Sequence, residues 1–308
     1  MRLVQATAAI AALTAGLVLL VHSAPNSSSS TPAAFPGANG RIVFSSERGG
    51  NADIYTMRPN GTRVRRLTSH RGSDVTPSFS ANGRRIAFAS DRSGNYEIYT
   101  MTARGKRVRR LTHASGRDLG PSFSPRGRRL AFESTRHDRT GEIYSMRRNG
   151  SHVRRLTRRG SSNWRPAFSP DGRAIAFDGS RGPPAGRSIL LMRPNGSHKR
   201  RVTGGAFGVS PTFSPDGRRL VFVGDRHRDL FSVRRNGSDL RRLTDNRRSL
   251  EFSPAFSPDG TKVAFARVGR KRSRIFVITA DGLRVRKIRG VSVGWGGLDW
   301  GPRPKRRR

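Results

Sequence analysis

The stretch PAFSPDGRAIAF, residues 166–177, decides the fold, because related copies of it recur along the whole chain. Its Pro-x-Phe element returns every 43 to 45 residues, beginning at Pro77, Pro121, Pro166, Pro211 and Pro254. An altered sixth copy, Leu298-Asp299-Trp300, stands 44 residues after the fifth. Self-similarity at a fixed period of 20 to 50 residues is typical of solenoids, propellers and other repeat architectures.

Each repeat is built from a tight turn followed by short apolar segments. In the quoted copy, Pro170 presets φ, and Gly172 accepts the positive φ of the turn. Ile175 and Phe177 then alternate with other residues at period two, which predicts a buried strand. A third apolar segment, an Asn-Gly or similar turn and a short fourth segment follow, as at 98–101 and 108–112. Each repeat therefore predicts four short antiparallel strands.

Six such units predict an all-β protein, a six-bladed β-propeller of four-stranded antiparallel blades. The chain enters at a second strand, 41–45, and leaves on a lone first strand, 298–300. We expect the C-terminal strand to pair into the first blade, which closes the ring and removes its exposed edges. The predicted boundaries are a signal peptide at 1–23, a flexible linker at 24–37, the propeller at 38–301 and a basic tail at 302–308.

The repeats resemble those of the TolB family and its WD-like propellers. The resemblance rests on the Pro-x-Phe-Ser-Pro-Asp-Gly pattern, the loop 90–95, the strand 98–101 and the segment 110–112. It implies the propeller fold and is much less specific for function, because one fold hosts unrelated sites. The repeats begin almost at the linker, so we expect no TolB-type N-terminal α/β domain, and the chain contains no Gly-x-Ser-x-Gly nucleophile elbow.

The N-terminal segment indicates export. An apolar run to Val21 follows Arg2, and small and polar residues come after it, which is typical of a secretory signal peptide. The alternative is an uncleaved anchor helix. The chain has no cysteine, which excludes disulfides and thiolate metal sites. We therefore expect a periplasmic or extracellular monomer without a membrane span in its mature form.

The candidate binding residues lie at or beside the position three residues before each Pro, where the chain enters a first strand and faces the central channel. This ring varies between blades, and a specific site is expected where a fixed scaffold carries variable residues. The predicted site consists of Asp74, Asp118, Asn163, Trp164, Arg165, Phe207, Glu251, Phe252 and Trp295. The alternative is that the polar members only cap neighbouring loops. The seven histidines form no metal-binding motif, so no metal or other cofactor is predicted.

Arginine recurs at two further places in the repeat. One position follows the second strand, where we expect hydrogen bonds and ion pairs between blades, with ligand binding as the alternative: Arg48, Arg92, Arg136, Arg181 and Arg226. The other is an Arg-Arg pair in the fourth segment, such as Arg65-Arg66, which predicts a basic belt around the rim. Charges at the outer strand also discourage edge-to-edge pairing.

The formal net charge of +41 would attract any polyanion. Nucleic acid is not the expected partner, because aromatic residues do not interleave with the basic runs. We therefore favour a non-enzymatic binding module that contacts a protein or glycan of the bacterial envelope through the channel-face loops. Two alternatives remain: a polyanion-binding surface protein that uses the Arg-rich rim, and a lyase or hydrolase with its site at the channel mouth. We find no convergent His/Glu/Asp cluster or metal set in the sequence that would favour an enzyme.

Overall fold

The computed structural model describes residues 34–137, 140–158, 162–180, 186–204, 207–224, 227–246, 249–269, 273–294 and 296–305. The predicted signal peptide, the linker up to residue 33 and the last three residues of the tail lie outside the described residues.

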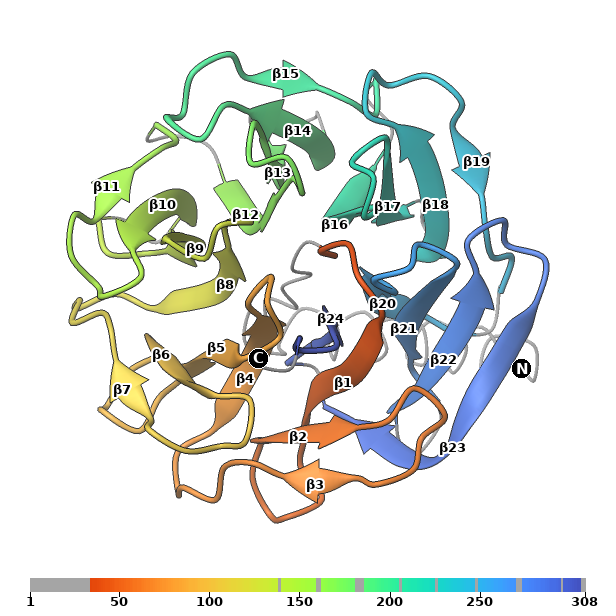
Figure 1. Ribbon diagram of the computed structural model, residues 1–308. Helices are drawn as coiled ribbons and strands as arrows, with labels where there is room; N and C mark the ends of the chain where they lie inside the picture. The colour runs from red at the N-terminus through yellow and green to blue at the C-terminus, as the bar shows by residue number, and fades with distance from the viewer. Residues whose placement is uncertain are drawn as a thin grey trace, which may run out of the picture.

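Six four-stranded antiparallel sheets surround a central axis, so the predicted six-bladed propeller is confirmed (Figure 1). The innermost strands are β4 (Asp74–Phe79), β8 (Asp118–Phe123), β12 (Ser162–Phe168), β16 (Gly208–Phe213), β20 (Glu251–Phe256) and β24 (Leu298–Pro302). The second strands are β1 (Asn39–Ser46), β5 (Arg85–Ser90), β9 (Arg129–Ser134), β13 (Ile175–Ser180), β17 (Arg219–Gly224) and β21 (Lys262–Arg267). The third strands are β2 (Asp53–Met57), β6 (Glu97–Thr102), β10 (Glu142–Arg147), β14 (Ser188–Met192), β18 (Asp229–Arg234) and β22 (Ser273–Thr279). The outermost strands are β3 (Arg65–Arg66), β7 (Arg109–Arg110), β11 (Arg154–Arg155), β15 (Arg200–Arg201), β19 (Arg241–Arg242) and β23 (Val285–Val293).

The ring closes as expected. Strand β24 pairs antiparallel with β1, and Ile42 lies opposite Trp300 while Phe44 lies opposite Leu298. Blade 1 therefore consists of β24, β1, β2 and β3, and blades 2 to 6 follow in chain order. Because the last strand of the chain completes the first blade, both ends of the array lose their free inner edge.

Five of the six outermost strands are shorter than the sequence predicts. The segment 64–68 contributes only Arg65 and Arg66 to the ladder, opposite Thr56 and Tyr55. The ladder stops there because the Thr68 hydroxyl, rather than a backbone carbonyl, accepts the N–H of Ile54 at 2.9 Å. The same side-chain bond recurs in the following blades, where Ile98 donates to Thr112 and Ile143 to Thr157.

Aromatic pairs fill the space between blades. Phe44 stacks on Tyr55 and Phe88 on Tyr99, each with ring centroids 5.8 Å apart. Each Phe is the second apolar residue of its period-two strand, and both phenylalanines are fully buried. Burying one such side chain stabilises the fold by about 2 kcal/mol, so the repeated pattern supplies most of the core.

The predicted flexible linker is wrong at its C-terminal end. Ala34 and Phe35 are buried and belong to core clusters with inner-strand residues of several blades. The N–H of Gly37 donates to the carbonyl of Pro258 at 3.1 Å, which holds this segment against blade 6. The apolar side chain of Phe35 is buried in the core rather than exposed to solvent. Residues 34–37 therefore belong to the folded domain.

The antiparallel order gives the propeller two distinct faces. The turns between first and second strands and those between third and fourth strands lie at one end, which we call the turn face. The loops between second and third strands and the connections between blades lie at the other end, which we call the loop face. Segment 34–37 lies at the turn face, beside Pro302 and Pro258.

Candidate functional site

The acidic residues of the predicted ring lie in the first strands rather than in loops. Asp74, Asp118 and Glu251 begin β4, β8 and β20 at the loop face, and all three are fully buried. The backbone N–H of each donates to a carbonyl of the preceding blade: Asp74 to Ala52 at 2.6 Å, Asp118 to Tyr96 at 2.8 Å and Glu251 to Arg228 at 3.1 Å. The ring therefore joins neighbouring blades through backbone bonds.

The side chains of these acids are paired with arginine. Arg92 contacts both carboxylate oxygens of Asp74 at 2.8 Å, and Arg136 contacts Asp118 at 2.6 Å. In blade 6, Arg267 pairs with Glu251. Arg92 and Arg136 were expected to pair between blades, and that expectation is wrong. They pair within a blade, because the end of a second strand lies beside the start of its own first strand.

The other recurrent arginines behave differently. The guanidinium of Arg48 lies 5.2 Å from the ring centroid of Tyr55, as Arg92 lies over Tyr99 and Arg136 over Tyr144, but among the described residues no acid pairs with Arg48. Arg181 and Arg226 lie outside the described residues, as does Trp295 of the predicted site.

Burial dominates the electrostatics of the acidic ring. It raises the pKa of the Asp118 carboxyl to about 6, although the Arg136 charge opposes this shift. Burial also raises the pKa of Glu251 against the hydrogen bond from Thr244 and the contact with Arg267. Removing one partner of a buried pair typically costs about 3–5 kcal/mol. Breaking one of these pairs is therefore expected to be costly, and all three carboxylates are fully buried rather than open to a partner.

A cluster that departs from the repeat lies where blades 3, 4 and 5 meet on the loop face. Glu133 and Asp178 occupy the second-strand position that Ala89, Val223 and Ala266 fill in other blades. Both acids are fully buried. They differ from the ring acids because each reaches across to the next blade.

The carboxylates of Glu133 and Asp178 accept hydrogen bonds from backbone N–H groups of residues with positive φ. The residue before each repeated Pro has positive φ, including Arg165 at 53° and Ser210 at 57°. Such a conformation turns the N–H inward, where it needs an acceptor. The N–H of Arg165 donates to Glu133 at 2.6 Å, and that of Ser210 donates to Asp178 at 3.2 Å. Positive φ is uncommon outside glycine, so these bonds fix a backbone that would otherwise be disfavoured.

Asp178 also gathers arginines. Arg165 Nη1 lies 3.2 Å from its carboxylate and Arg187 Nε lies 2.8 Å from it. Arg228 lies near both arginines, and burial together with their charges lowers the pKa of its guanidinium. The charges that act on the Arg228 guanidinium are those of Arg165 and Arg187, and among the described residues no carboxylate pairs with it, since Asp178 pairs with the other two arginines. At this junction, Arg165, Arg187 and Arg228 therefore lie together, and Asp178 is the main carboxylate that balances their charge.

Sequence reasoning missed Arg187 and Arg228 as site residues. They stand just before the third strands of blades 4 and 5, at the position that Ala52, Tyr96 and Gly141 fill in blades 1 to 3. An alignment of the repeats shows this difference, but only the fold brings the two side chains beside Arg165.

The remaining predicted residues divide between this cluster and the core. Trp164 is half-buried, its Nε1 donates to Ser162 at 2.5 Å, and its ring covers Gly141, where an added Cβ would lie 2.5 Å from ring atoms. Asn163 is buried and donates to Glu142 at 3.0 Å. Phe207 is half-buried ahead of β16, whereas Phe252 is buried in a core cluster.

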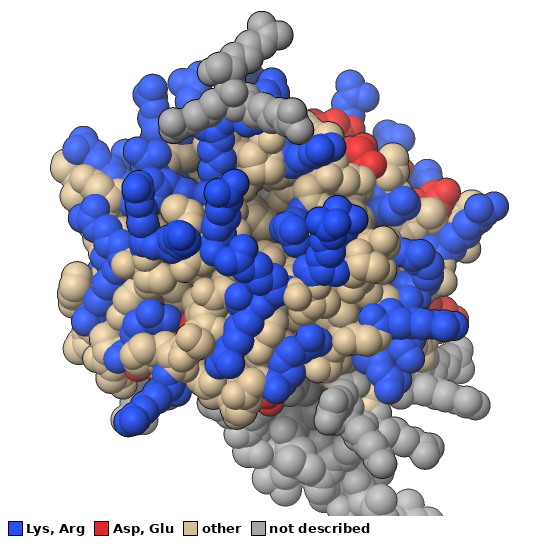
Figure 2. Space-filling view, turned by 60° about the horizontal axis from the view of Figure 1, so that its bottom comes forward, with Lys and Arg blue, Asp and Glu red and all other residues tan. Residues whose placement is uncertain are grey.

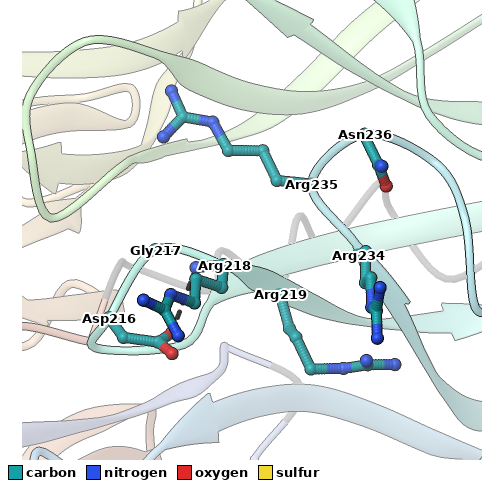
Figure 3. A pocket seen from close by; sticks show the side chains of 7 residues that line it. All are labelled: Asp216, Gly217, Arg218, Arg219, Arg234, Arg235 and Asn236. Atoms are coloured by element: carbon teal, nitrogen blue, oxygen red, sulfur yellow. Dashed lines mark hydrogen bonds between the residues drawn. The ribbon is translucent and has the colours of Figure 1, made fainter.

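The turn face is hollowed at blade 5 (Figure 3). The hollow has a volume of about 740 Å³ and is lined by Asp216, Gly217, Arg218, Arg219, Arg234, Arg235 and Asn236. Arg219 and Arg234 point toward one another from adjacent strands, while Arg235 extends away and pairs with Asp171 of blade 4 at 2.8 Å.

Among the described residues, only part of the predicted basic rim consists of arginines without an acidic partner. In blades 1, 2, 3 and 5, the second arginine of the fourth-strand pair turns inward to a buried acid that begins the third strand, as Arg66 does to Asp53 and Arg110 to Glu97. The first arginine of these pairs is exposed. Figure 2 shows the consequence, a surface covered by Lys and Arg with few acidic side chains.

Two further searches concern only the residues that the structure describes. Within them, no helix is long and apolar enough to cross a membrane. The same residues contain no group of three His, Cys, Asp or Glu side chains arranged to hold a metal ion.

Known proteins match this arrangement. The model of the TolB beta propeller domain matches residues 5–117 and 69–247. A protein TolB homolog of Chlorobium luteolum is 46% identical over 43 residues, which cover 14% of this chain and only 10% of that protein. TolB from Acinetobacter baumannii superimposes with a TM-score of 0.72 at 22% identity, over 89% of this chain and 68% of that one. Putative TolB from Agrobacterium tumefaciens gives a TM-score of 0.68 at 20% identity, over 86% and 99% of the two chains. Because the domain model spans more than half of the sequence, this chain belongs to the TolB β-propeller domain family.

Proposed function

We propose that this chain is an exported binding module without catalytic activity, and that a protein or glycan of the bacterial envelope docks on its loop face at blades 3 to 5. A TolB-like propeller suggests a binding module, and four residues that depart from the repeat lie at this junction: Glu133, Asp178, Arg187 and Arg228. The observation that carries the proposal is the half-buried Arg228, which lies beside Arg165 and Arg187 and pairs with no carboxylate among the described residues.

The position of the cluster supports this choice of face. Segment 34–37 lies at the turn face and places Phe35 among inner-strand residues, whereas the cluster lies at the opposite end. Trp164 and Phe207 add half-buried aromatic surface beside the arginines. Aromatic and arginine side chains dominate the energetics of many protein interfaces. The docking partner is therefore expected to bring an acidic group to Arg228.

The test is recovery of a partner from the envelope fraction by the mature domain, at two salt concentrations. R228A is expected to lower recovery of that partner at least about tenfold, the effect of losing roughly 1.4 kcal/mol or more. R117A is the matched control, because Arg117 is an exposed arginine on the loop face of blade 2. Equal recovery by both variants, or turnover of a tested substrate by the wild type, would overturn the proposal.

A second candidate is general adhesion to polyanions through the exposed arginines of the rim. Figure 2 favours it, since Lys and Arg take up much more of the face in that view than Asp and Glu do. Binding of this kind falls steeply with moderate salt, whereas docking at the Arg228 cluster is expected to lose less because the cluster is partly buried.

A further inference from the structure

Blade 5 contains an internal carboxylate site on the turn face, away from the loop-face cluster. Asp239 accepts from Arg219 Nη1 at 2.6 Å and Arg241 Nε at 2.6 Å, and Arg234 Nε lies 3.5 Å away. Hydrogen bonds from Arg219 and Arg241 lower the pKa of Asp239 to about 2. Three arginines from three adjacent strands thus converge on one carboxylate.

The strand register places the same three positions together in every blade. Arg219 lies opposite Arg234, and Arg241 pairs with Ser232, two residues before Arg234. In blade 1, Arg41 precedes Ile42, which lies opposite Met57, so Arg41 and Arg58 correspond to the first two. Arg65 pairs with Thr56 and corresponds to the third.

Blade 3 repeats the arrangement. Arg129 lies opposite Arg147, and Arg154 pairs with Ser145. We call these sets the arginine triads of blades 1, 3 and 5. The other blades lack one or more members: Thr102 and Thr279 replace the second arginine in blades 2 and 6, and Ala174 replaces the first in blade 4.

The triads of blades 1 and 3 lack the acid that fills the triad of blade 5. The position of Asp239, with φ of 54°, is Arg63 in blade 1 at 53° and His152 in blade 3 at 56°. Arg41 donates to the carbonyl of Arg63 at 3.3 Å, just as Arg219 donates to the carbonyl of Asp239 at 2.9 Å. The backbone conformation at this position is therefore alike in the three blades, and blade 1 also keeps the arginine bond to the carbonyl, but blades 1 and 3 lack the carboxylate.

The blade 1 triad consists of cations that repel one another. Arg58, Arg63 and Arg65 lower the pKa of Arg41, after the larger effect of burial. Among the described residues, none of the six arginines in the triads of blades 1 and 3 forms an ion pair. All six are exposed.

We propose that the arginine triads of blades 1 and 3 each bind one carboxylate of an external acidic polysaccharide, taking it where blade 5 holds Asp239. Guanidinium groups match carboxylates in planar, charge-assisted hydrogen bonds. The two open triads repeat one recognition element around the ring. A polymer with regularly spaced uronic acids fits such a surface.

The experiment compares two double variants that change the charge equally. R63D/H152D places Asp at the Asp239 position of both open triads, and R107D/H198D places it at the same position of blades 2 and 4, whose sets are incomplete. Both variants alter the same face by the same charge. Binding of a fluorescently labelled oligogalacturonate is measured by anisotropy at about 150 mM salt, where distant charges are largely screened.

R63D/H152D is expected to weaken oligogalacturonate binding at least about tenfold, and R107D/H198D less than about threefold. Conversely, D239N opens the triad of blade 5 and is expected to strengthen binding, a gain that misfolding cannot produce. Equal losses in the two double variants would overturn the proposal, because net charge alone would then explain binding. Tighter binding of poly-glutamate than of oligogalacturonate would overturn the polysaccharide assignment. Neither result depends on Arg228 or the loop face.

Discussion

Asp299 offers a direct test of how the ring is closed. It is the second residue of β24, lies opposite Val43, and has an exposed fraction of 1%. Its carboxyl oxygens accept the backbone N–H of Phe79 in blade 2 and of Trp300, each at 2.7 Å. Burial raises the pKa of Asp299 to about 7, although these two hydrogen bonds act in the opposite direction.

The direction of the pH effect follows from this raised pKa. The folded protein keeps the Asp299 proton up to about pH 7, while the unfolded chain releases it near the ordinary value of 3.8. The stability that the protonated Asp299 contributes to the folded state is therefore fully present below pH 3.8 and is lost as the pH rises to about 7. A difference of about 3 pKa units at 1.36 kcal/mol each corresponds to about 4 kcal/mol.

The perturbation is D299N, which stays uncharged at every pH and keeps an oxygen for the Phe79 N–H. Urea unfolding, followed by tryptophan fluorescence from pH 4 to pH 8, gives the free energy of unfolding of both proteins. Between pH 4 and 7, we expect the free energy of unfolding of D299N to rise relative to that of the wild type by about 1.4 kcal/mol per pH unit. The Asp118 titration is present in both proteins and cancels in the difference. A difference that does not change with pH would refute the assigned protonation of Asp299.

Three further perturbations test the site and the closure. R136M leaves the buried Asp118 without its cation, so it should cost about 3–5 kcal/mol in urea unfolding at pH 8 and less at pH 5, where Asp118 is protonated. G141A places a Cβ against the Trp164 ring, so the near-ultraviolet circular dichroism spectrum should change and the free energy of unfolding should fall by about 1–3 kcal/mol. An unchanged spectrum would contradict the position of the ring. Deleting 298–308 exposes the edge of β1 and should produce aggregation in size-exclusion chromatography, whereas deleting 306–308 should not.

The fold could be predicted from the sequence because each repeat specifies its own blade. Pro170 and Gly172 fix a turn, and Ile175 and Phe177 mark the buried side of the next strand. Closure was also predictable, since Leu298 to Trp300 form an inner strand without a blade of its own. The error at segment 34–37 has a simple cause: small residues and prolines resemble a linker, and one buried Phe35 outweighs them.

The contacts of the candidate site could not be predicted in the same way. Asp74 was found as a ring residue, but its burial and its pairing with Arg92 depend on the register of β4 against β5. Glu133 and Asp178 are visible in the sequence as acids at an apolar position. Their role, which is to hold the N–H of a residue in the next blade, depends on how blades pack and has no signature along the chain.

The burial of the acids sharpens the meaning of the +41 charge. A preference for Arg over Lys leaves net charge unchanged, so the excess reflects 20 acidic residues against 61 basic ones. Ten of those acids are buried: Asp53, Asp74, Glu97, Asp118, Glu133, Glu142, Asp178, Asp229, Glu251 and Asp299. No described Lys or Arg is buried to that degree. The surface therefore carries a larger excess of positive over negative charge than the composition alone indicates. A partner meets exposed arginines, whereas half of the acids are buried. Arg228 and the open triads are the places where those arginines converge, so a selective anion would be recognised there rather than evenly over the rim.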